Sequence, residues 1–278
     1  MKTITLPDEL DLDHPQPVQV FEYHSSQEID RQQVILTKNT FSFLIEGTKE
    51  VVFDNSTLSI ENSKFLLMKS GHCLMTEKLS EVKNYSSILL FFSNEILLNF
   101  IRKNEFKTTK ATEYKSVHSF GFDEFIQRFV SSLSDINRLS KNVKEKLLEL
   151  KFEEIMLYLT ELYGTEFLHS LTTNSNDATQ KFTRIVESNQ LSKLTLKELA
   201  FLCDMSVSTF KRTFEKHYFE SPIKWFQNKR LEHAHYLLKQ KQKSSSEIYH
   251  EIGYENLSSF VQAYKLKYGI TPKQHHKN

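Results

Sequence analysis

Short runs of alternating hydrophobic and polar residues fill the chain between Pro17 and Phe92. These runs are rich in β-branched and aromatic residues, and glycine or polar residues separate them: FEYH, QVILT, FSFLIEG, KEVVFD, STLSIE, KFLLMKS, HCLMTEK and SSILLFF. Alternation with a period of two predicts β-strands, and the Asp54-Asn55 pair between two runs predicts a hairpin turn. Strands at this spacing predict a small β-barrel or jelly roll over residues 17–92.

The hydrophobic period becomes helical after residue 93. Apolar residues three and four apart predict helices over residues 94–103, 123–133 and 143–163. The inner side of the third helix is expected to hold Leu147, Leu148, Leu150, Ile155, Leu157, Leu159 and Leu162. Such helices pack either on the barrel or on a second copy of the chain, and both alternatives stay open. Residues 1–170 are interpreted as a sensing and dimerisation domain, and the polar residues 171–180 as a linker.

Two stretches of the C-terminal part, residues 195–216 and 244–268, resemble each other. Each begins with Thr or Ser followed three residues later by Glu, which is the pattern of a capping box. A short amphipathic helix, a break and a second helix follow in each, and Gly253 suits the second break because glycine tolerates the left-handed conformation. This order is that of a helix-turn-helix unit, whose second helix fits the major groove of DNA.

A predicted connecting helix joins the two units. Ser221 caps this helix and Pro222 occupies its first position, where the missing N–H costs nothing. Its buried face is expected to comprise Ile223, Phe226, Leu231, Ala234, Leu237 and Leu238. A connector of this length lets two recognition helices read successive major grooves, about 34 Å apart, without a dimer.

The region from about Phe182 to Pro272 resembles the tandem helix-turn-helix domain of the AraC/XylS family of bacterial regulators. The matching residues occur in the family's order: Leu199, Ala200, Met205, Ser206, Phe210, Lys211, Arg212, Thr213, Phe214, Ser221, Pro222, Arg230, Leu231, Ala234, Leu237, Leu238, Ile248, Ile252, Gly253, Tyr254, Ser258, Ser259, Phe260, Tyr264, Tyr268, Gly269, Ile270, Thr271 and Pro272. The sequence departs from the family at Phe219, where Gly is usual, at Tyr249, where Ala is usual, and at Gln262, where Arg is frequent. It also lacks the family's Tyr-Arg pair after the second Pro.

The resemblance implies an α+β protein with two domains. These are an N-terminal cupin-like β-barrel with flanking helices and a C-terminal all-α tandem helix-turn-helix domain over residues 181–278. It further implies a sequence-specific, homodimeric transcription activator that contacts RNA polymerase. A small-molecule or protein effector would control it through the N-terminal domain. The alternative is a cupin-like sensor of ligands or proteins whose DNA binding is secondary.

Helical spacing selects the side chains that face double-stranded DNA. If Phe210 and Phe214 face inward, the outward or flanking candidates on the two recognition helices are Ser208, Thr209, Lys211, Arg212, Ser258, Ser259, Gln262 and Lys265. Arg212 and Lys211 can donate to guanine O6 and N7, and Gln262 can pair with adenine. Each could instead contact phosphate or solvent. Because Gln262 replaces a frequent Arg, the first unit is expected to supply most base-specific contacts.

Further phosphate contacts are expected at the starts of the two first helices and at nearby lysines. Helix N-termini bind anions through backbone N–H groups. The candidates are Lys193, Thr195, Lys229, Ser244 and Lys267. For each of them a solvated surface position is the alternative.

The net charge of +1 hides an asymmetry along the 278 residues. From Asp177 onwards there are 17 Lys and Arg against 10 Asp and Glu, a net charge of +7. The remainder has 19 against 25, a net charge of −6. A basic C-terminal part beside an acidic N-terminal part fits two modules with different partners, one of them a polyanion such as DNA.

The sequence offers no pattern typical of an enzyme, a cofactor site or a membrane protein. The histidines of the first part (His14, His24, His72, His118 and His169) lack the spacing of a cupin metal site, and no GxSxG or phosphate-binding loop occurs. No apolar run approaches the roughly 18 residues of a membrane span, and no export signal is visible. A cytoplasmic protein is expected, with Cys73 and Cys203 reduced and His275-His276 in a disordered tail.

Overall fold

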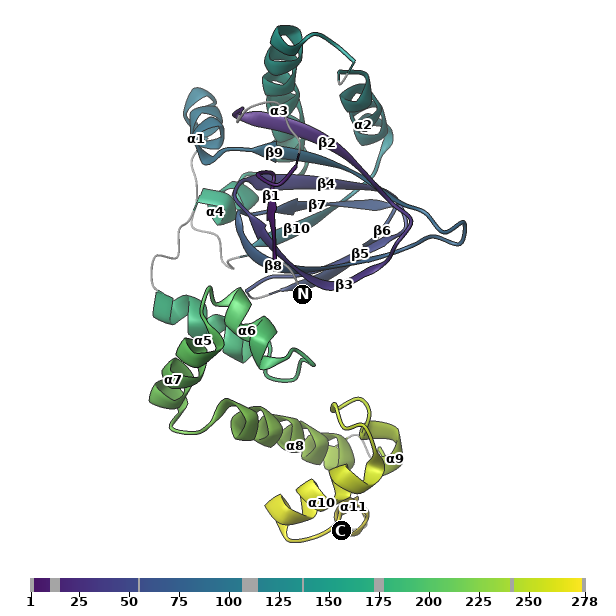
Figure 1. Ribbon diagram of the computed structural model, residues 1–278, viewed down its shortest axis with the longest axis vertical. Coiled ribbons are helices and arrows are strands. Elements are labelled where there is room, and N and C mark those ends of the chain that lie inside the picture. Colours follow the sequence, from purple (N-terminus) through teal and green to yellow (C-terminus); the bar gives the residue numbers. More distant parts are fainter. Residues whose placement is uncertain are drawn as a thin grey trace. The chain divides into compact units, whose positions relative to one another are not determined.

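The computed structural model describes residues 3–10, 16–54, 56–106, 115–136, 138–172, 178–240 and 243–276. The chain divides into two compact units, Met1–Gln180 and Lys181–Asn278. The first contains the strands and the second is helical (Figure 1). This is the α+β, two-domain fold class that the sequence predicts.

Two five-stranded sheets form the first unit within the described residues. One sheet has the order β1 (Ile4–Leu6), β3 (Ile29–Leu36), β8 (Gly71–Lys78), β5 (Thr48–Val52) and β6 (Thr57–Glu61). The other has the order β10 (Val117–Gly121), β7 (Lys64–Met68), β4 (Asn39–Glu46), β9 (Tyr85–Phe92) and β2 (Val18–Ser25). Neighbouring strands are antiparallel except β1 and β3, which are parallel.

Every strand predicted between residues 17 and 92 is present, but β1 and β10 lie outside that range. The strand β1 has only three residues, and β10 is separated from the other strands by a helix, so neither belongs to the alternating series. The predicted turn residue Asn55 lies outside the described residues, although β5 and β6 on either side of it pair as a hairpin.

The second sheet is buried on both faces. Alternate residues such as Phe43 and Leu90 join a core shared with the helices, whereas Leu44 and Leu66 join the core between the two sheets. This explains why β9 is buried at every position and shows little polar alternation.

Helices α1 (Asn94–Lys103), α2 (Glu124–Ile136), α3 (Lys141–Tyr163) and α4 (Glu166–Thr172) share this core with the second sheet. The first three match the predicted helices to within three residues at either end. The short α4 was not predicted, and its buried Leu171 shows that residues 171 and 172 end a helix, whereas a polar linker was expected to start there. The described residues 178–180 likewise belong to the next helix, α5 (Ala178–Ser188).

The inner face of α3 differs from the prediction at three leucines. The exposed fractions of Leu150, Leu157 and Leu162 are 60%, 44% and 52%. Helical spacing puts Leu148, Phe152, Ile155, Met156 and Leu159 on the buried side instead. Leucines occur on several faces of this helix, so the pattern alone could not show which face packs on the sheet.

The second unit continues with α6 (Leu196–Leu202), α7 (Val207–Tyr218), α8 (Pro222–Gln240), α9 (Ser245–Ile248), α10 (Leu257–Tyr268) and α11 (Pro272–His276). Two sequence predictions were wrong here. Ile223 is 67% exposed, because it lies off the face of α8 that buries Pro222 and Phe226. The expected tail at His275-His276 is the last turn of α11.

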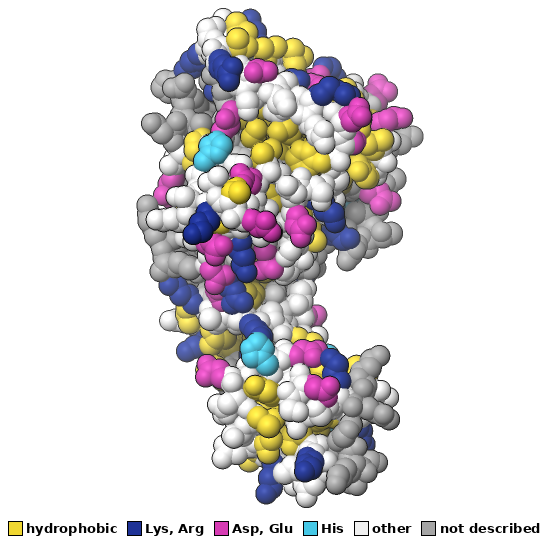
Figure 2. Space-filling model, turned by 90° about the vertical axis from the view of Figure 1, so that its right-hand side faces the viewer, with side chains coloured by type: hydrophobic (Ala, Val, Ile, Leu, Met, Phe, Trp, Pro, Cys, Tyr) yellow, Lys and Arg dark blue, Asp and Glu magenta, His cyan; other side chains and the backbone are white. Residues whose placement is uncertain are grey.

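Basic and acidic side chains intermingle on one face of the molecule. On the face shown in Figure 2, Lys and Arg are scattered among Asp and Glu and do not gather into one basic patch. Helix α3 is the longest helix of the described ranges, and neither it nor any other described helix could cross a membrane.

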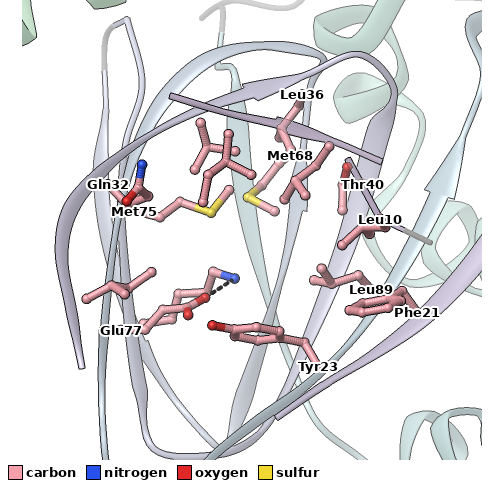
Figure 3. A pocket seen from close by; sticks show the side chains of 15 residues that line it. Leu10, Phe21, Tyr23, Gln32, Leu36, Thr40, Met68, Met75, Glu77 and Leu89 are labelled. Atoms are coloured by element: carbon pink, nitrogen blue, oxygen red, sulfur yellow. Dashed lines mark ion pairs between the residues drawn. The ribbon is translucent and has the colours of Figure 1, made fainter. Parts of the chain in front are cut away.

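A cavity of about 160 Å³ lies between the two sheets of the first unit (Figure 3). Side chains from both sheets line it, and the N-terminal segment contributes Ile4, Leu6 and Leu10. The paired buried side chains of Lys49 and Glu77 form part of its wall.

Candidate nucleic-acid interface

The recognition helix of the first helix-turn-helix unit is α7. The hydroxyl of Ser206 caps it by accepting a hydrogen bond from the Thr209 backbone N at 3.1 Å. On its inner face Phe210 and Phe214 are fully buried and pack against Phe182 of α5. Residues four apart lie on one face of a helix, so this packing sets the rotation of α7 and therefore which side chains point outward.

The second helix-turn-helix unit repeats this construction with α10. Asn256 caps the helix, because its Oδ1 accepts a hydrogen bond from the Ser259 backbone N at 2.9 Å. Phe260 and Tyr264 are fully buried. The turn before α10 contains Gly253 with a φ of +85°, the left-handed conformation that the sequence predicted. The preceding helix α9 has only four residues, shorter than the two turns expected.

All eight predicted DNA-contact residues lie on α7 or α10. Their side chains are exposed, except that of Thr209, which is half-buried and within 2.9 Å of the Ser206 hydroxyl. Lys211 and Arg212 make no hydrogen bond or ion pair with another described residue, so both cations are available to a ligand. The structure therefore brings together on each recognition helix the side chains that the sequence selected.

The capping boxes predicted at the two first helices are present. Glu198 accepts a hydrogen bond from the Thr195 backbone N at 2.6 Å, and Glu247 accepts one from the Ser244 backbone N at 2.7 Å. A carboxylate at each of these N-termini already interacts favourably with the helix dipole. A DNA phosphate bound at either place would have to compete with that carboxylate.

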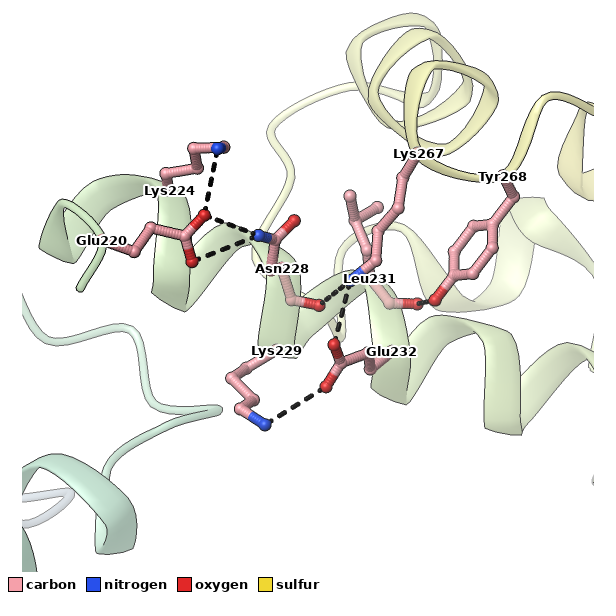
Figure 4. A network of polar contacts seen from close by, with 8 residues as sticks. All are labelled: Glu220, Lys224, Asn228, Lys229, Leu231, Glu232, Lys267 and Tyr268. Carbon is pink, nitrogen blue, oxygen red and sulfur yellow. Dashed lines mark hydrogen bonds and ion pairs between the residues drawn. The ribbon is translucent and has the colours of Figure 1, made fainter. Parts of the chain in front are cut away.

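Two lysines suggested as phosphate contacts pair with Glu232 of α8, and one of them, Lys267, joins α10 to α8 (Figure 4). Lys267 lies 3.1 Å from Glu232 and donates to the Asn228 carbonyl at 2.9 Å, and Lys229 lies 3.3 Å from the other Glu232 oxygen. Partial burial opposes ionisation, but hydrogen bonds from Lys267 and Lys229 outweigh it and lower the pKa of Glu232. The sequence pattern did not show this network, because its members come from two helices.

Helix α8 holds both units at a defined spacing. At its start Trp225 and Phe226 pack on Phe214 of the first recognition helix. Further along, Leu231 shares a core with Phe260 of the second recognition helix. The 19 residues of α8 span about 28 Å at 1.5 Å per residue. That length is close to one turn of DNA, about 34 Å.

The C-terminal helix α11 contacts α8 and α10 of the second helix-turn-helix unit through a cluster of tyrosine and histidine side chains. The Tyr264 hydroxyl lies 3.1 Å from Nδ1 of His235 and 2.8 Å from Nδ1 of His275. The two imidazole rings are 4.4 Å apart between centroids. A buried tyrosine needs a partner for its hydroxyl, and that requirement is the signal in the sequence that could have suggested an ordered His275.

The described residues contain no group of three or more His, Cys, Asp or Glu that could hold a metal ion. Cys73 and Cys203 are buried and form no disulfide, and burial raises the pKa of Cys73 to about 12.

Known protein families match both units of the chain. Residues 39–171 match the family described as the ExsA N-terminal regulatory domain, and residues 199–278 match a helix-turn-helix domain family. The first match covers most of both sheets and the helices α1 to α4. The second covers the recognition helices α7 and α10 together with α8.

Among characterised proteins, the thermoregulatory protein LcrF of Yersinia pestis is 33% identical over 129 residues, which are 46% of this chain and 48% of that protein. The transcriptional regulator ExsA of Pseudomonas aeruginosa is 28% identical over 54% of this chain and 64% of its own. The chain therefore matches about half to two thirds of the length of these relatives. A solved structure of ToxT from Vibrio cholerae aligns with 96% of this chain and 99% of its own at 15% identity, with a TM-score of 0.47. That likeness is too low to bear on function.

The family resemblance seen in the sequence is thus supported independently for each unit. The N-terminal unit matches a family of regulatory domains, and the C-terminal unit matches a family of helix-turn-helix domains. The two matches therefore support the resemblance of this chain to the AraC/XylS family of transcription regulators.

Proposed function

We propose that this protein is a sequence-specific transcription activator that binds two successive major grooves of DNA through α7 and α10. The observation that carries the proposal is the exposed pair Lys211 and Arg212 on a recognition helix whose rotation is set by buried aromatic residues. The activator role is supported by a related protein named as the virulence regulon transcriptional activator VirF of Yersinia enterocolitica. Activation would involve contact with RNA polymerase.

Arg212→Ala tests the proposal directly. Loss of a base-reading arginine costs about 1–3 kcal/mol of binding free energy and relaxes the preference at one base pair. The matched control is Lys239→Ala, which removes one exposed positive charge from α8 and leaves both recognition helices unchanged. Gel-shift titrations on the protein's own promoter DNA should show a large loss for the first variant and a small one for the second. Equal affinities and unchanged base preference for Arg212→Ala would refute direct base reading.

The two units are proposed to contribute unequally. Gln262 on α10 occupies an exposed position but carries no charge, and α10 otherwise presents Ser258, Ser259 and Lys265. We expect Gln262→Ala to leave the base preferences under the second unit nearly unchanged. Operator scanning that placed the strongest preferences under α10 would contradict this assignment.

A homodimer through α3 is part of the proposed function. The exposed apolar side chains of Val143, Leu150 and Leu157 recur every seven residues, so they form one stripe along this helix. An exposed apolar stripe on a long helix favours packing against a copy of itself. The double variant Leu150→Glu, Leu157→Glu should be monomeric by analytical ultracentrifugation. A wild-type protein that sediments as a monomer at micromolar concentration would exclude this dimer.

The N-terminal unit is proposed to receive the controlling signal, from either a small molecule or a protein. Its match to a family of regulatory domains supports that role. Measurement of promoter affinity for the full chain, alone and with a candidate effector, tests it.

A further inference from the structure

The cavity between the two sheets has mostly apolar walls. Val34 and Met75 line it from the first sheet, and Phe21, Met68 and Leu89 line it from the second. Its volume is about 160 Å³. An apolar cavity of about 150 Å³ inside a protein is large enough to bind benzene.

One wall of this cavity is charged. Lys49 on β5 and Glu77 on β8 stand opposite each other in neighbouring strands, with Nζ and Oε1 3.0 Å apart. The side chains are 2% and 5% exposed. The Lys49 ammonium also donates to the Ser42 hydroxyl at 3.2 Å. In Figure 3, Glu77 and Tyr23 project toward each other at this end of the cavity.

One oxygen of the Glu77 carboxylate can still accept a hydrogen bond. Its Oε2 atom is buried and has no hydrogen-bond partner within 3.5 Å among the described residues. A buried carboxylate oxygen without a donor is costly, so a molecule that supplied a donor there would gain a charge-assisted hydrogen bond.

The pair is electrically balanced, which limits the charge of what it can attract. Burial opposes the charge on Lys49, but Tyr85 and Glu77 outweigh burial and raise the pKa of that ammonium. Lys49 therefore stays cationic and neutralises Glu77. An anion would meet no net positive charge in this cavity, and a second cation would meet no net negative charge.

We propose that this cavity binds a compact, uncharged, apolar molecule, of about the size of benzene to indole, whose single hydrogen-bond donor reaches Oε2 of Glu77. A sugar carries more hydroxyl groups than the apolar walls can satisfy, and a long acyl chain exceeds the volume. The inference rests on the proposed regulatory role of the N-terminal unit, because it names the class of effector that this unit accepts.

Phenol and toluene form a matched pair of probes, because they differ by a hydroxyl against a methyl group. Isothermal calorimetry on the full chain should show phenol binding about tenfold more tightly than toluene, and phenol should raise the melting temperature. Octanoate should bind more weakly than phenol. Equal affinity for phenol and toluene, no binding of phenol, or tighter binding of octanoate would each overturn the proposal.

Two variants assign any binding to this cavity. In the double variant Lys49→Met, Glu77→Leu, the pair is replaced by apolar side chains of similar volume, which a folded core usually accepts. This variant should bind toluene at least as tightly as phenol. Leu89→Phe should fill the cavity and weaken both probes. A preference for phenol that survived the double variant would place its site elsewhere and refute the assignment.

The failure of this inference can be told apart from the failure of the proposed function. Probe binding is measured without DNA, and promoter binding is measured without probe. A chain that binds promoter DNA but not phenol refutes only the ligand class. A chain that binds phenol but shows no Arg212-dependent DNA binding refutes only the transcription role.

Discussion

Tyr264→Phe should loosen the second helix-turn-helix unit by removing one oxygen atom. The phenol ring of Tyr264 is fully buried, and phenylalanine keeps that packing. The lost hydroxyl lies within hydrogen-bond distance of His235 and His275, at 3.1 and 2.8 Å. Each such bond contributes about 0.5–1.5 kcal/mol, so the variant should lose about 1–3 kcal/mol of the free energy of unfolding at pH 7.5.

The loss should depend on pH. Burial and Lys239 lower the pKa of His235, and burial, His235 and Lys239 lower that of His275. An unfolded histidine titrates near pH 6.5. The unfolded chain therefore binds more protons as the pH falls through about 6.5, and stability present above that pH is lost below it. The Tyr264 hydroxyl has one proton, so it donates to one imidazole and accepts from the Nδ1–H of the other. Protonation of the accepting imidazole removes the first of these bonds, so the penalty of Tyr264→Phe should shrink at pH 5.5.

The chain's one tryptophan supplies the assay. Trp225 lies in α8, so its fluorescence in a urea titration reports unfolding of the C-terminal unit. The matched control is Tyr268→Phe on the same helix, whose hydroxyl makes only a long hydrogen bond of 3.4 Å to the Leu231 carbonyl. We expect the control to cost less than about 0.5 kcal/mol. The reasoning is refuted if both variants cost the same, or if the Tyr264→Phe penalty is equal at both pH values.

Three further predictions concern buried or strained positions. Gly253→Ala should lower unfolding free energy by about 1–2 kcal/mol, measured by urea titration, because φ is +85° and the new Cβ would lie 3.2 Å from Arg230. Glu77→Leu alone should cost about 3–5 kcal/mol, because it strands the Lys49 charge, and adding Lys49→Met should restore most of it. For His118, burial followed by Lys115 lowers the pKa to about 4, so the N-terminal unit should lose about 2–3 kcal/mol between pH 6.5 and 4. His118→Gln should remove this pH dependence from thermal unfolding curves, and an unchanged profile would contradict it.

Local patterns predicted the elements well, because strands and caps are defined by residues close together in sequence. Ser206 and Asn256 cap their helices as their types suggest, and each is followed by a buried aromatic four residues later. The buried face of α3 was harder to predict, because the exposed Leu150 and Leu157 are as hydrophobic as the leucines that pack on the sheet. The face of α3 that becomes buried is the one that packs on the second sheet. The strands of that sheet lie far from α3 in the sequence, so the local pattern does not show which face this is.

The buried pair of Lys49 and Glu77 could be predicted from the sequence only in part. Lys49 alternates in phase with Val51 and Phe53, both buried, so the pattern of β5 already points Lys49 inward. A buried lysine calls for a partner, but nothing local names Glu77, because β8 becomes the neighbour of β5 only through the sheet order. For the same reason, the sequence did not show the cavity of the N-terminal unit.

The proposal that the two helix-turn-helix units contribute unequally has structural support besides the uncharged Gln262. On α7 the cations Lys211 and Arg212 are unpaired with any described residue, so their donors remain for DNA. On α10 the partly buried Lys267 is held by Glu232 and the Asn228 carbonyl, both on α8. One cation of α10 thus helps to fix the orientation of this helix relative to the connecting helix α8. This difference supports the proposal that α10 positions the protein on the DNA backbone and that α7 reads the bases.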